Sequence, residues 1–389
     1  MLQRLSAALF KRLARIIGFL PAFVLRCLNF RVLPVYVSRI GHLALEVDCY
    51  LKEEELRLHP RYTAVLCAPA GGVANRRLLD YWSSYVRVIS SPWILSVLKP
   101  ITSQKILQFD VHRYASVIND TAAFPSIQKQ WGDRPPLLSL KPDDVARGEQ
   151  RLQELGIPAG AWLVCVHSRE GEYSRQDEHI HSYRNSDIDT YVLAMAAIVE
   201  RGGWCVRIGD PSMKKLSPMP NVVDYAHHLL RADWMDLFLC ARCRFFLGNS
   251  SGPFLVASIF GVPVALANLL PVSTVLPYGK KDLGIPKLLR SAKEQRLLTF
   301  PEVLGSPIGN MRYAKEYQQA GIDIIDNTSE DILGLALEQL ERTERRAPYT
   351  AIDEDLQTRF KALLKPGHYT YGSDSRIGRA FLRKHAELL

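Results

Sequence analysis

Residues 162–169 read Trp-Leu-Val-Cys-Val-His-Ser-Arg, an apolar run that ends abruptly in polar and charged side chains. Such a run predicts a buried strand whose carboxyl end carries His167 and Arg169. Ligands of open α/β sheets bind at the carboxyl ends of the strands. The sequence therefore places these two side chains at a candidate binding edge.

A second predicted strand, residues 204–208, repeats this arrangement and ends in Gly209-Asp210. Arg207 falls inside its apolar run, where a buried charge is costly unless it is paired. Arg207 is therefore expected either to pair with a nearby carboxylate or to reach into a cleft.

A third predicted strand, residues 244–248, runs into Asn249-Ser250-Ser251-Gly252-Pro253 and then into a helical pattern. Small hydroxyl residues and glycine at a helix start, with proline in the first turn, leave backbone N–H groups free to hold an anion such as phosphate. The alternative is that Asn249, Ser250 and Ser251 only cap the helix. Together, the three strand ends indicate a site for a phosphate-bearing substrate.

The alternation of strands and helices over residues 162–267 predicts a doubly wound α/β unit. A chain of 389 residues exceeds the size of one usual hydrophobic core, so two domains are expected. The predicted fold class is α/β, with two Rossmann-like, parallel-sheet domains facing a cleft and an amphipathic N-terminal helix. The expected boundaries are a basic N-terminal segment 1–30, domains 31–155 and 156–345, and a helical tail 346–389.

The order of these motifs also carries a family resemblance. His167-Ser-Arg169, Tyr183-Arg184-Asn185, Arg207-Ile-Gly209-Asp210 and the run from Cys243 to Gly252 together resemble a group of bacterial glycosyltransferases of the two-domain GT-B type. The His-x-Arg element is similar to one in fucosyltransferase-like enzymes. The resemblance is best over residues 155–345 and weaker over 30–150.

The resemblance implies transfer of a hexosyl or deoxyhexosyl group from a nucleotide-sugar to a cell-envelope or surface glycan, or to a lipid-linked acceptor. Domain 31–155 would then bind the acceptor and domain 156–345 the nucleotide-sugar. Because cations and helix-start N–H groups can neutralise a departing diphosphate, neither a metal nor a resident cofactor is expected. The alternative is an inactive nucleotide-sugar-binding or scaffold protein of the same fold.

These expectations assign roles to particular residues. The catalytic candidates are His167 and Arg169; the donor-binding candidates are Arg207, Gly209, Asp210, Asn249, Ser250, Ser251 and Gly252; the acceptor-binding candidates are Gly41, His42 and Asn75. For His167 the alternative is a satisfied core histidine, and for Arg169 it is an ion pair with the following loop. That loop, residues 170–185, is rich in ionisable groups, is long enough to form a lid and offers several candidate bases.

The basic charge is concentrated at the N-terminus. The first 45 residues hold seven Arg or Lys and no acidic residue, which leaves +2 of the net +9 for the rest of the chain. A nucleic-acid partner is therefore not expected, because a groove binder spreads basic residues over its folded surface. Leucines and isoleucines at positions 2, 5, 9, 13, 16 and 20 share one helical face, which suits a helix lying on an anionic membrane surface. The alternative is a helix docked on its own domain.

No apolar run near the N-terminus is long enough to span a membrane, and no signal-peptide cleavage pattern follows. The seven cysteines are an odd number, and several fall in apolar runs. A cytoplasmic protein, peripheral on the inner face of the membrane, is the expectation. Cys240-x-x-Cys243 and His179-x-His181 lack further ligands at metal spacing.

Overall fold

The computed structural model describes residues 16–115, 123–171 and 175–389 and confirms the α/β class. The chain divides into two compact units, Met1–Ile118 and Asn119–Leu389. No helix within the described ranges is long and apolar enough to cross a membrane. The predicted amphipathic face over residues 1–15 lies outside the described residues, whereas residues 16–27 are helical.

The second unit is built on one seven-stranded sheet in which every pairing is parallel. Its strand order is β13-β9-β8-β7-β4-β5-β6. The bounds are β4 (Leu163–His167), β5 (Trp204–Arg207), β6 (Val222–Asp224), β7 (Phe246–Gly248), β8 (Val264–Leu269), β9 (Leu283–Pro286) and β13 (Arg376–Ile377). From β4 the chain first adds β5 and β6 on one side and then returns to add β7, β8 and β9 on the other. The strand order therefore reverses between β4 and β7.

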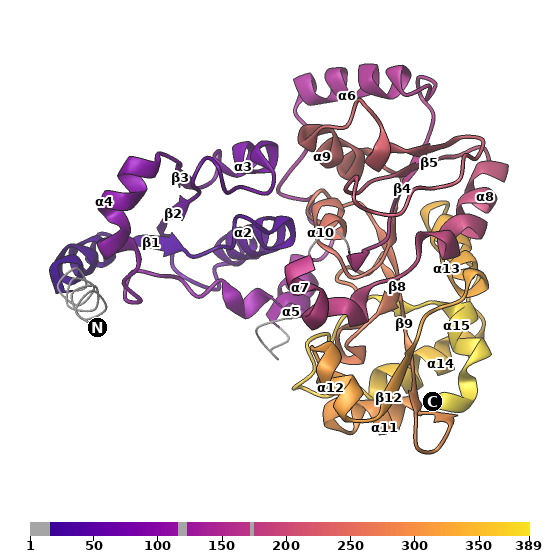
Figure 1. Ribbon diagram of the computed structural model, residues 1–389. Helices are drawn as coiled ribbons and strands as arrows, with labels where there is room; N and C mark the ends of the chain where they lie inside the picture. Colours follow the sequence, from indigo (N-terminus) through magenta and orange to yellow (C-terminus); the bar gives the residue numbers. More distant parts are fainter. Residues whose placement is uncertain (1–15, 116–122, 172–174) are drawn as a thin grey trace. The chain divides into compact units, whose positions relative to one another are not determined.

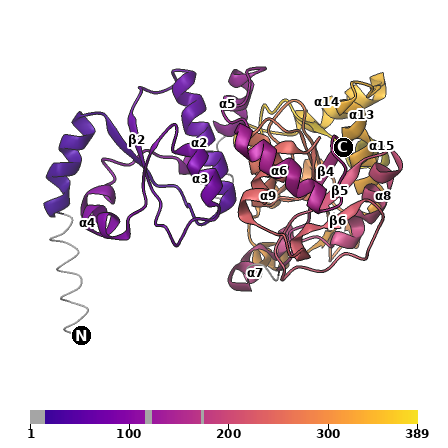
Figure 2. The ribbon, with the colours of Figure 1, turned by 90° about the horizontal axis from the view of Figure 1, so that it is seen from above.

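Helices cover both faces of this sheet (Figures 1 and 2). α8 (Val192–Glu200) and α13 (Ser329–Thr343) pack together on one face, and α9 (Asp233–Arg242) and α10 (Gly252–Ile259) lie on the other. Because both faces are covered, every residue of β4 and β8 is buried, which explains why these strands read as continuous apolar runs. The predicted doubly wound pattern over residues 162–267 is confirmed.

A smaller sheet and the C-terminal tail complete the second unit. β10 (Leu288–Ser291) pairs antiparallel with β11 (Arg296–Leu297) and β12 (Ile322–Ile325). The tail contains α14 (Ala351–Ala362), β13 and α15 (Arg379–Lys384). The tail, expected to be helical over residues 346–389, is interrupted by β13, which adds to the edge of the large sheet beside β9.

The boundary between the units falls at Ile118, whereas the sequence placed it after Leu155. Residues 123–154 form α5 (Ala123–Trp131) and α6 (Pro142–Glu154), and α6 packs on α9. Gly148 of α6 lies against the ring of Phe238, and Arg147 stacks over Trp234 with 3.8 Å to the ring centroid. Contacts distant in sequence thus bind α6 to the second unit.

The first unit carries a three-stranded parallel sheet of order β1-β2-β3. The strands are β1 (Phe30–Leu33), β2 (Thr63–Cys67) and β3 (Arg87–Ile89), and the helices are α2 (Ile40–Glu55), α3 (Arg76–Trp82) and α4 (Pro92–Thr102). β1 ends at Leu33, because Pro34 has no N–H to continue the ladder.

Candidate functional site

The strand-order reversal brings the two principal sequence motifs into direct contact. At the end of β4, His167 Nδ1 lies 3.0 Å from the carbonyl oxygen of Ile208, and its Nε2 lies 2.9 Å from Ser251 Oγ at the start of α10. Because a carbonyl only accepts, Nδ1 must donate, and Nε2 of the neutral ring then accepts from the Ser251 hydroxyl. His167 thereby fixes Ser251 at the switch point, where ligands of such sheets bind.

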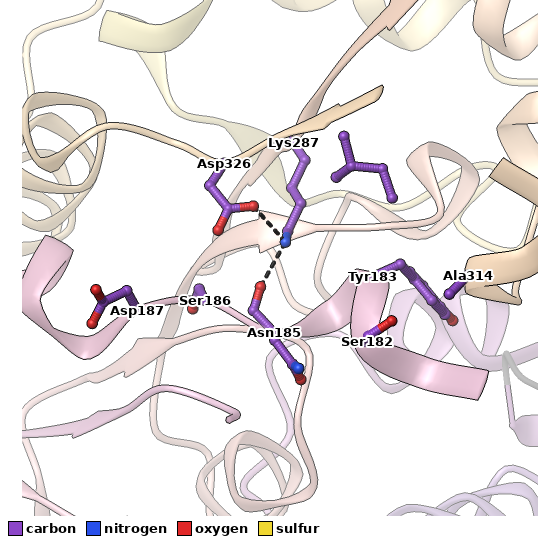
Figure 3. Close-up of a pocket in the computed structure, with 9 residues that line it drawn as sticks. Ser182, Tyr183, Asn185, Ser186, Asp187, Lys287, Ala314 and Asp326 are labelled. Atoms are coloured by element: carbon purple, nitrogen blue, oxygen red, sulfur yellow. Dashed lines mark hydrogen bonds and ion pairs between the residues drawn. The ribbon is translucent and has the colours of Figure 1, made fainter. Parts of the chain in front are cut away.

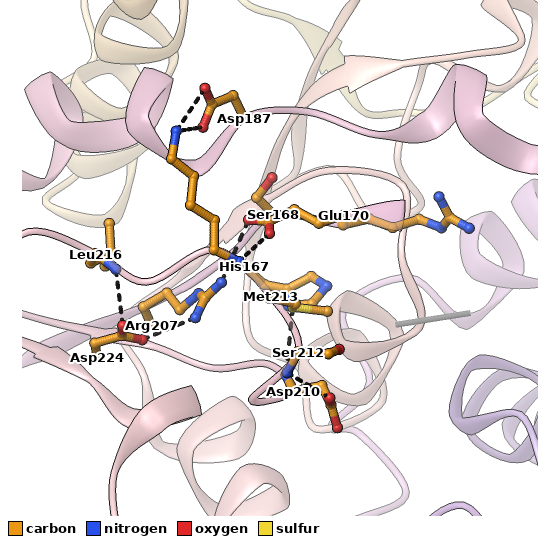
Figure 4. A network of polar contacts seen from close by, with 12 residues as sticks. His167, Ser168, Glu170, Asp187, Arg207, Asp210, Ser212, Met213, Leu216 and Asp224 are labelled. Atoms are coloured by element: carbon orange, nitrogen blue, oxygen red, sulfur yellow. Dashed lines mark hydrogen bonds and ion pairs between the residues drawn. The ribbon is translucent and has the colours of Figure 1, made fainter. Parts of the chain in front are cut away.

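His167 is held neutral by its surroundings (Figure 4). Burial lowers its pKa to about 4, and the nearby charges of Arg207 and Arg169 act in the same direction. The Ile208 carbonyl opposes this shift without overcoming it. With both ring nitrogens already bonded, His167 positions Ser251 in this structure and has no nitrogen left to offer.

Asn249 ties the β7–α10 turn to the loop after β4. The side chain is fully buried. Its Oδ1 accepts from the N–H of Arg169 at 3.0 Å, while Nδ2 donates to Arg184 O and to Ser186 Oγ, both at 3.0 Å. These three hydrogen bonds join the turn to the loop and so hold its shape.

Two arginines flank this turn. Arg184 donates to the carbonyl oxygen of Ser250 through Nε at 3.0 Å and Nη2 at 2.6 Å. Arg169 donates to the side chain of Asn185 and lies 3.8 Å from Glu178 Oε2. The second contact matches the alternative of an ion pair with the following loop. That loop contains a helix, α7 (Arg175–His181), rather than a wholly irregular lid.

Arg207 lies between two carboxylates in a fully buried position (Figure 4). Its Nη1 is 3.0 Å from Asp224 Oδ1, and its Nη2 is 3.5 Å from Glu170 Oε1. The first alternative therefore applies, namely pairing rather than extension into a cleft. The adjacent Gly209 packs against Met213, and Asp210 lies 3.8 Å from Arg231.

The start of α10 offers unused donors. Among the residues that the structure describes, no acceptor is found for the backbone N–H groups of Ser250, Ser251 and Gly252. The Ser251 side chain makes no capping bond, and its hydroxyl donates to His167 instead. A role as helix cap therefore does not explain why a serine occupies position 251. Three half-buried N–H groups at the positive end of a helix can hold an anion.

A pocket of about 390 Å³ lies beside the loop that follows β4 (Figure 3). Its lining is mostly polar and includes Asn185, Asp187, Lys287 and Asp326. Lys287 Nζ lies 2.6 Å from both Asn185 O and Asp326 Oδ1. Burial lowers the pKa of Lys287, although Asp326 opposes the shift. Through Asn185, the pocket is connected to Arg169 at the end of β4.

The acceptor-side candidates lie in the first unit, at the carboxyl edge of its own sheet. Gly41 and His42 stand in the first turn of α2, and Asn75 precedes α3. The loops after β1 and β2 meet there, since Ala74 N donates to Val37 O at 2.9 Å. Asn75 is buried and caps α3 by accepting from the N–H of Leu78, whereas His42 contacts Glu46.

Several residues of these sites escaped the sequence prediction. The sequence left Lys287 either substrate-facing or only at the surface, and nothing in the Pro-rich loop before it indicated that it is buried. Glu46 contacts His42, four residues before it, and His112, 66 residues after it, and no local motif reveals the second contact. A carboxylate four residues after His42, on an otherwise apolar helical face, is the one available signal.

No protein-family model matches the chain, and no curated protein matches it. Among solved structures, E. coli ADP-heptose heptosyltransferase II shows 12% identity and a TM-score of 0.41, covering 62% of this chain and 86% of that one. A family 9 glycosyltransferase from Veillonella parvula shows 12% identity and a TM-score of 0.27, covering 56% and 59%. The iron-containing dodecameric glycosyltransferase TibC of enterotoxigenic E. coli shows 12% and 0.36, covering 62% and 60%. The chain spans less than two thirds of the latter two, and the superpositions identify no activity.

The low pKa of His167 makes stability depend on pH. The unfolded ring takes up a proton below its ordinary pKa of 6.5, whereas the folded ring does so only near 4. The free energy of unfolding should therefore fall as pH drops from 6.5 to 4, by up to about 3 kcal/mol from this residue. We expect His167→Gln to lose less stability over that interval in urea titrations. The exposed His179→Gln is the control; parallel curves for the parent and His167→Gln would contradict the assignment.

Proposed function

We propose that this protein is a glycosyltransferase that moves a sugar from a nucleotide-sugar to a cell-envelope or surface glycan. The observation that carries the proposal is the run of N–H groups at the start of α10, at the switch point of the large sheet, for which the described residues supply no acceptor. A diphosphate leaving group needs stabilisation where its negative charge develops. Helix-start amides supply it in fixed positions.

The remaining donor-site roles follow from this placement. Ser250, Ser251 and Gly252 hold the diphosphate, and His167 acts by fixing the Ser251 hydroxyl. Arg169 and Arg184 lie beside the turn and supply positive charge. We assign Arg207, Gly209, Asp210 and Asn249 to shaping the strand ends, because Arg207 Nη1 pairs with Asp224 and the other three residues make hydrogen bonds within the protein.

The polar pocket beside Asn185 suits the hydroxyl-rich part of the donor. Ser182 and Asp326 contribute a hydroxyl and a carboxylate to its lining, and sugar or ribose hydroxyls donate to such acceptors (Figure 3). Diphosphate charge is balanced here by arginines and amides, so we propose a transfer that requires neither a metal nor a resident cofactor. We propose that the sugar of the bound donor extends from the Ser250–Gly252 turn into this pocket.

The donor proposal is tested by calorimetry with UDP-, GDP-, CMP-, dTDP- and ADP-sugars. We expect one nucleotide-sugar to bind the parent and Gly252→Val to weaken that affinity at least about 10-fold, because the new side chain blocks backbone approach. Gly367→Val is the matched control, since no neighbour lies within 4 Å of its added Cβ. Equal affinity in the parent and Gly252→Val would remove the phosphate role. Binding without any transfer would favour the inactive, scaffold alternative.

We also propose that the first unit rests on the anionic inner face of the membrane. Along the helix over residues 16–27, Ile16, Leu20 and Val24 recur every four residues and are 74%, 68% and 48% exposed. On α4, Trp93 and Val97 show the same spacing at 74% and 57% exposure. No residue of α4 is buried. Large exposed apolar side chains on neighbouring helices are typical of interaction surfaces.

The two helices are in contact, since Gly18 packs closely against the backbone of Pro100. The opposite side of the N-terminal helix is docked through the buried Ala22, beside Val32 and Leu107. Docking and membrane contact are thus compatible on one helix. Residues 1–45 and 81–109 contain ten Arg or Lys and no acidic residue. That charge complements anionic lipid.

The membrane proposal predicts that Trp93→Ser/Val97→Ser reduces co-sedimentation with phosphatidylglycerol vesicles several-fold. The parent should bind at low salt and be released as salt screens its basic residues. Leu58→Ser is the control, because Leu58 is an exposed leucine outside both helices. Unchanged vesicle binding by the double variant, or a parent that does not bind the vesicles, would contradict the proposal.

A further inference from the structure

α2 carries an unusual set of buried charges. Asp48 is paired with Lys52 at 2.8 Å, and Glu53 is paired with Arg113. Glu46 is fully buried too, yet its partners among the described residues are two histidines rather than a lysine or arginine. A buried carboxylate is costly unless it is compensated.

The geometry around Glu46 fixes the form of both rings. His42 Nδ1 lies 2.7 Å from Glu46 Oε1, and His112 Nδ1 lies 3.4 Å from the same oxygen. An ionised carboxylate only accepts hydrogen bonds, so each neutral ring must present Nδ1–H to it. Each Nε2 then carries a lone pair. Among the described residues, neither ring has another hydrogen-bond partner.

The cluster lies where ligands of a parallel sheet bind. His42 follows the loop after β1 and stands in the first turn of α2, at the carboxyl edge of the first unit's sheet. The side chains of His42 and His112 remain 21% and 27% exposed, whereas that of Glu46 is inaccessible. Tyr36 stacks on His112, with ring centroids 4.9 Å apart, and meets His42 edge-on at 5.2 Å. A buried carboxylate thus stands behind two partly exposed bases.

We infer that His42 is the general base that activates the acceptor hydroxyl, with Glu46 as its positioning residue. This inference rests on the proposed transferase function. The acceptor O–H bond breaks as its proton passes to His42 Nε2. The oxygen forms a bond to the anomeric carbon, and the bond from that carbon to the diphosphate oxygen breaks, its electron pair leaving with the nucleoside diphosphate. The Glu46 carboxylate stabilises the imidazolium that results.

His42 takes this role rather than His112 because its contact with Glu46 is the shorter and better suited to a charge-assisted hydrogen bond. Buried carboxylates that hold a histidine by one nitrogen also fix its orientation and tautomer. His112 and Tyr36 then form one wall of the acceptor site. No residue of this cluster other than His42 had been singled out by the sequence.

One test does not depend on sugar transfer. Long-range ¹⁵N NMR at alkaline pH reports which ring nitrogen carries the proton, and the His42 signal is identified by its loss in His42→Ala. We expect the proton on Nδ1. A proton on Nε2 would overturn the inference whether or not the protein is a transferase, because that nitrogen would have no lone pair to accept a proton.

A second test uses the donor and acceptor that support turnover. His42→Ala should lower kcat by about 100-fold or more while the donor Kd stays unchanged, and added imidazole should restore part of the rate. Glu46→Gln keeps an acceptor oxygen for Nδ1–H but removes the negative charge, so it should lower kcat less. His59→Ala is the matched control, because His59 is a half-buried histidine of the same unit outside the cluster.

The outcomes separate the two proposals. Full turnover in His42→Ala, or a loss that imidazole does not relieve, would overturn the role of His42 and leave the transferase function standing. A parent with the expected tautomer that binds no nucleotide-sugar would instead count against the transferase function.

Discussion

The hydrogen bond between His167 and Ser251 is the interaction on which the donor site depends. It joins the ends of β4 and β7, the two strands between which the strand order reverses. Because His167 is buried and neutral, its Nε2 accepts from the serine hydroxyl, and that hydroxyl makes no capping bond to α10. The helix start is therefore left open to a ligand.

A buried polar network holds this arrangement in place. Asn249 bonds to three neighbours, and Ser168 donates to the carbonyl of Ser186. Such groups are costly to bury unless satisfied, so the loop after β4 and the turn after β7 are constrained to one geometry. Burial of polar groups here serves the shape of a site more than stability.

Much of the second unit was predictable, because local pattern determines it. The apolar run that ends at His167 predicts a strand, and Gly252-Pro253 predicts the start of a helix. Because the strands are parallel, their carboxyl ends then lie at the same edge of the sheet. The positions of α6 and β13 were not predictable. α6 is held by Phe238 and Trp234, and β13 by pairing with β9, all distant in sequence.

The site residues likewise fall into those that local sequence pattern predicts and those that depend on contacts distant in sequence. His167, Arg169 and the Ser250–Gly252 turn follow from strand ends, whereas the pairing of Arg207 with Asp224 and of Glu46 with His112 needs the folded chain. Sequence shows which residues reach an edge, but not which of them are already bonded to each other. Hence the sequence left two roles open for Arg207 and for Asn249, and only the structure shows that Arg207 pairs with Asp224 and that Asn249 bonds to the loop after β4.

The central claim is that the open start of α10 binds the diphosphate of a sugar donor. A crystal structure of the protein with a bound nucleoside diphosphate tests it most directly. The account predicts phosphate oxygens within hydrogen-bond distance of the Ser251 and Gly252 N–H groups, with Arg169 or Arg184 turned toward them. A diphosphate bound elsewhere on the chain, with these N–H groups contacting only water, would contradict it.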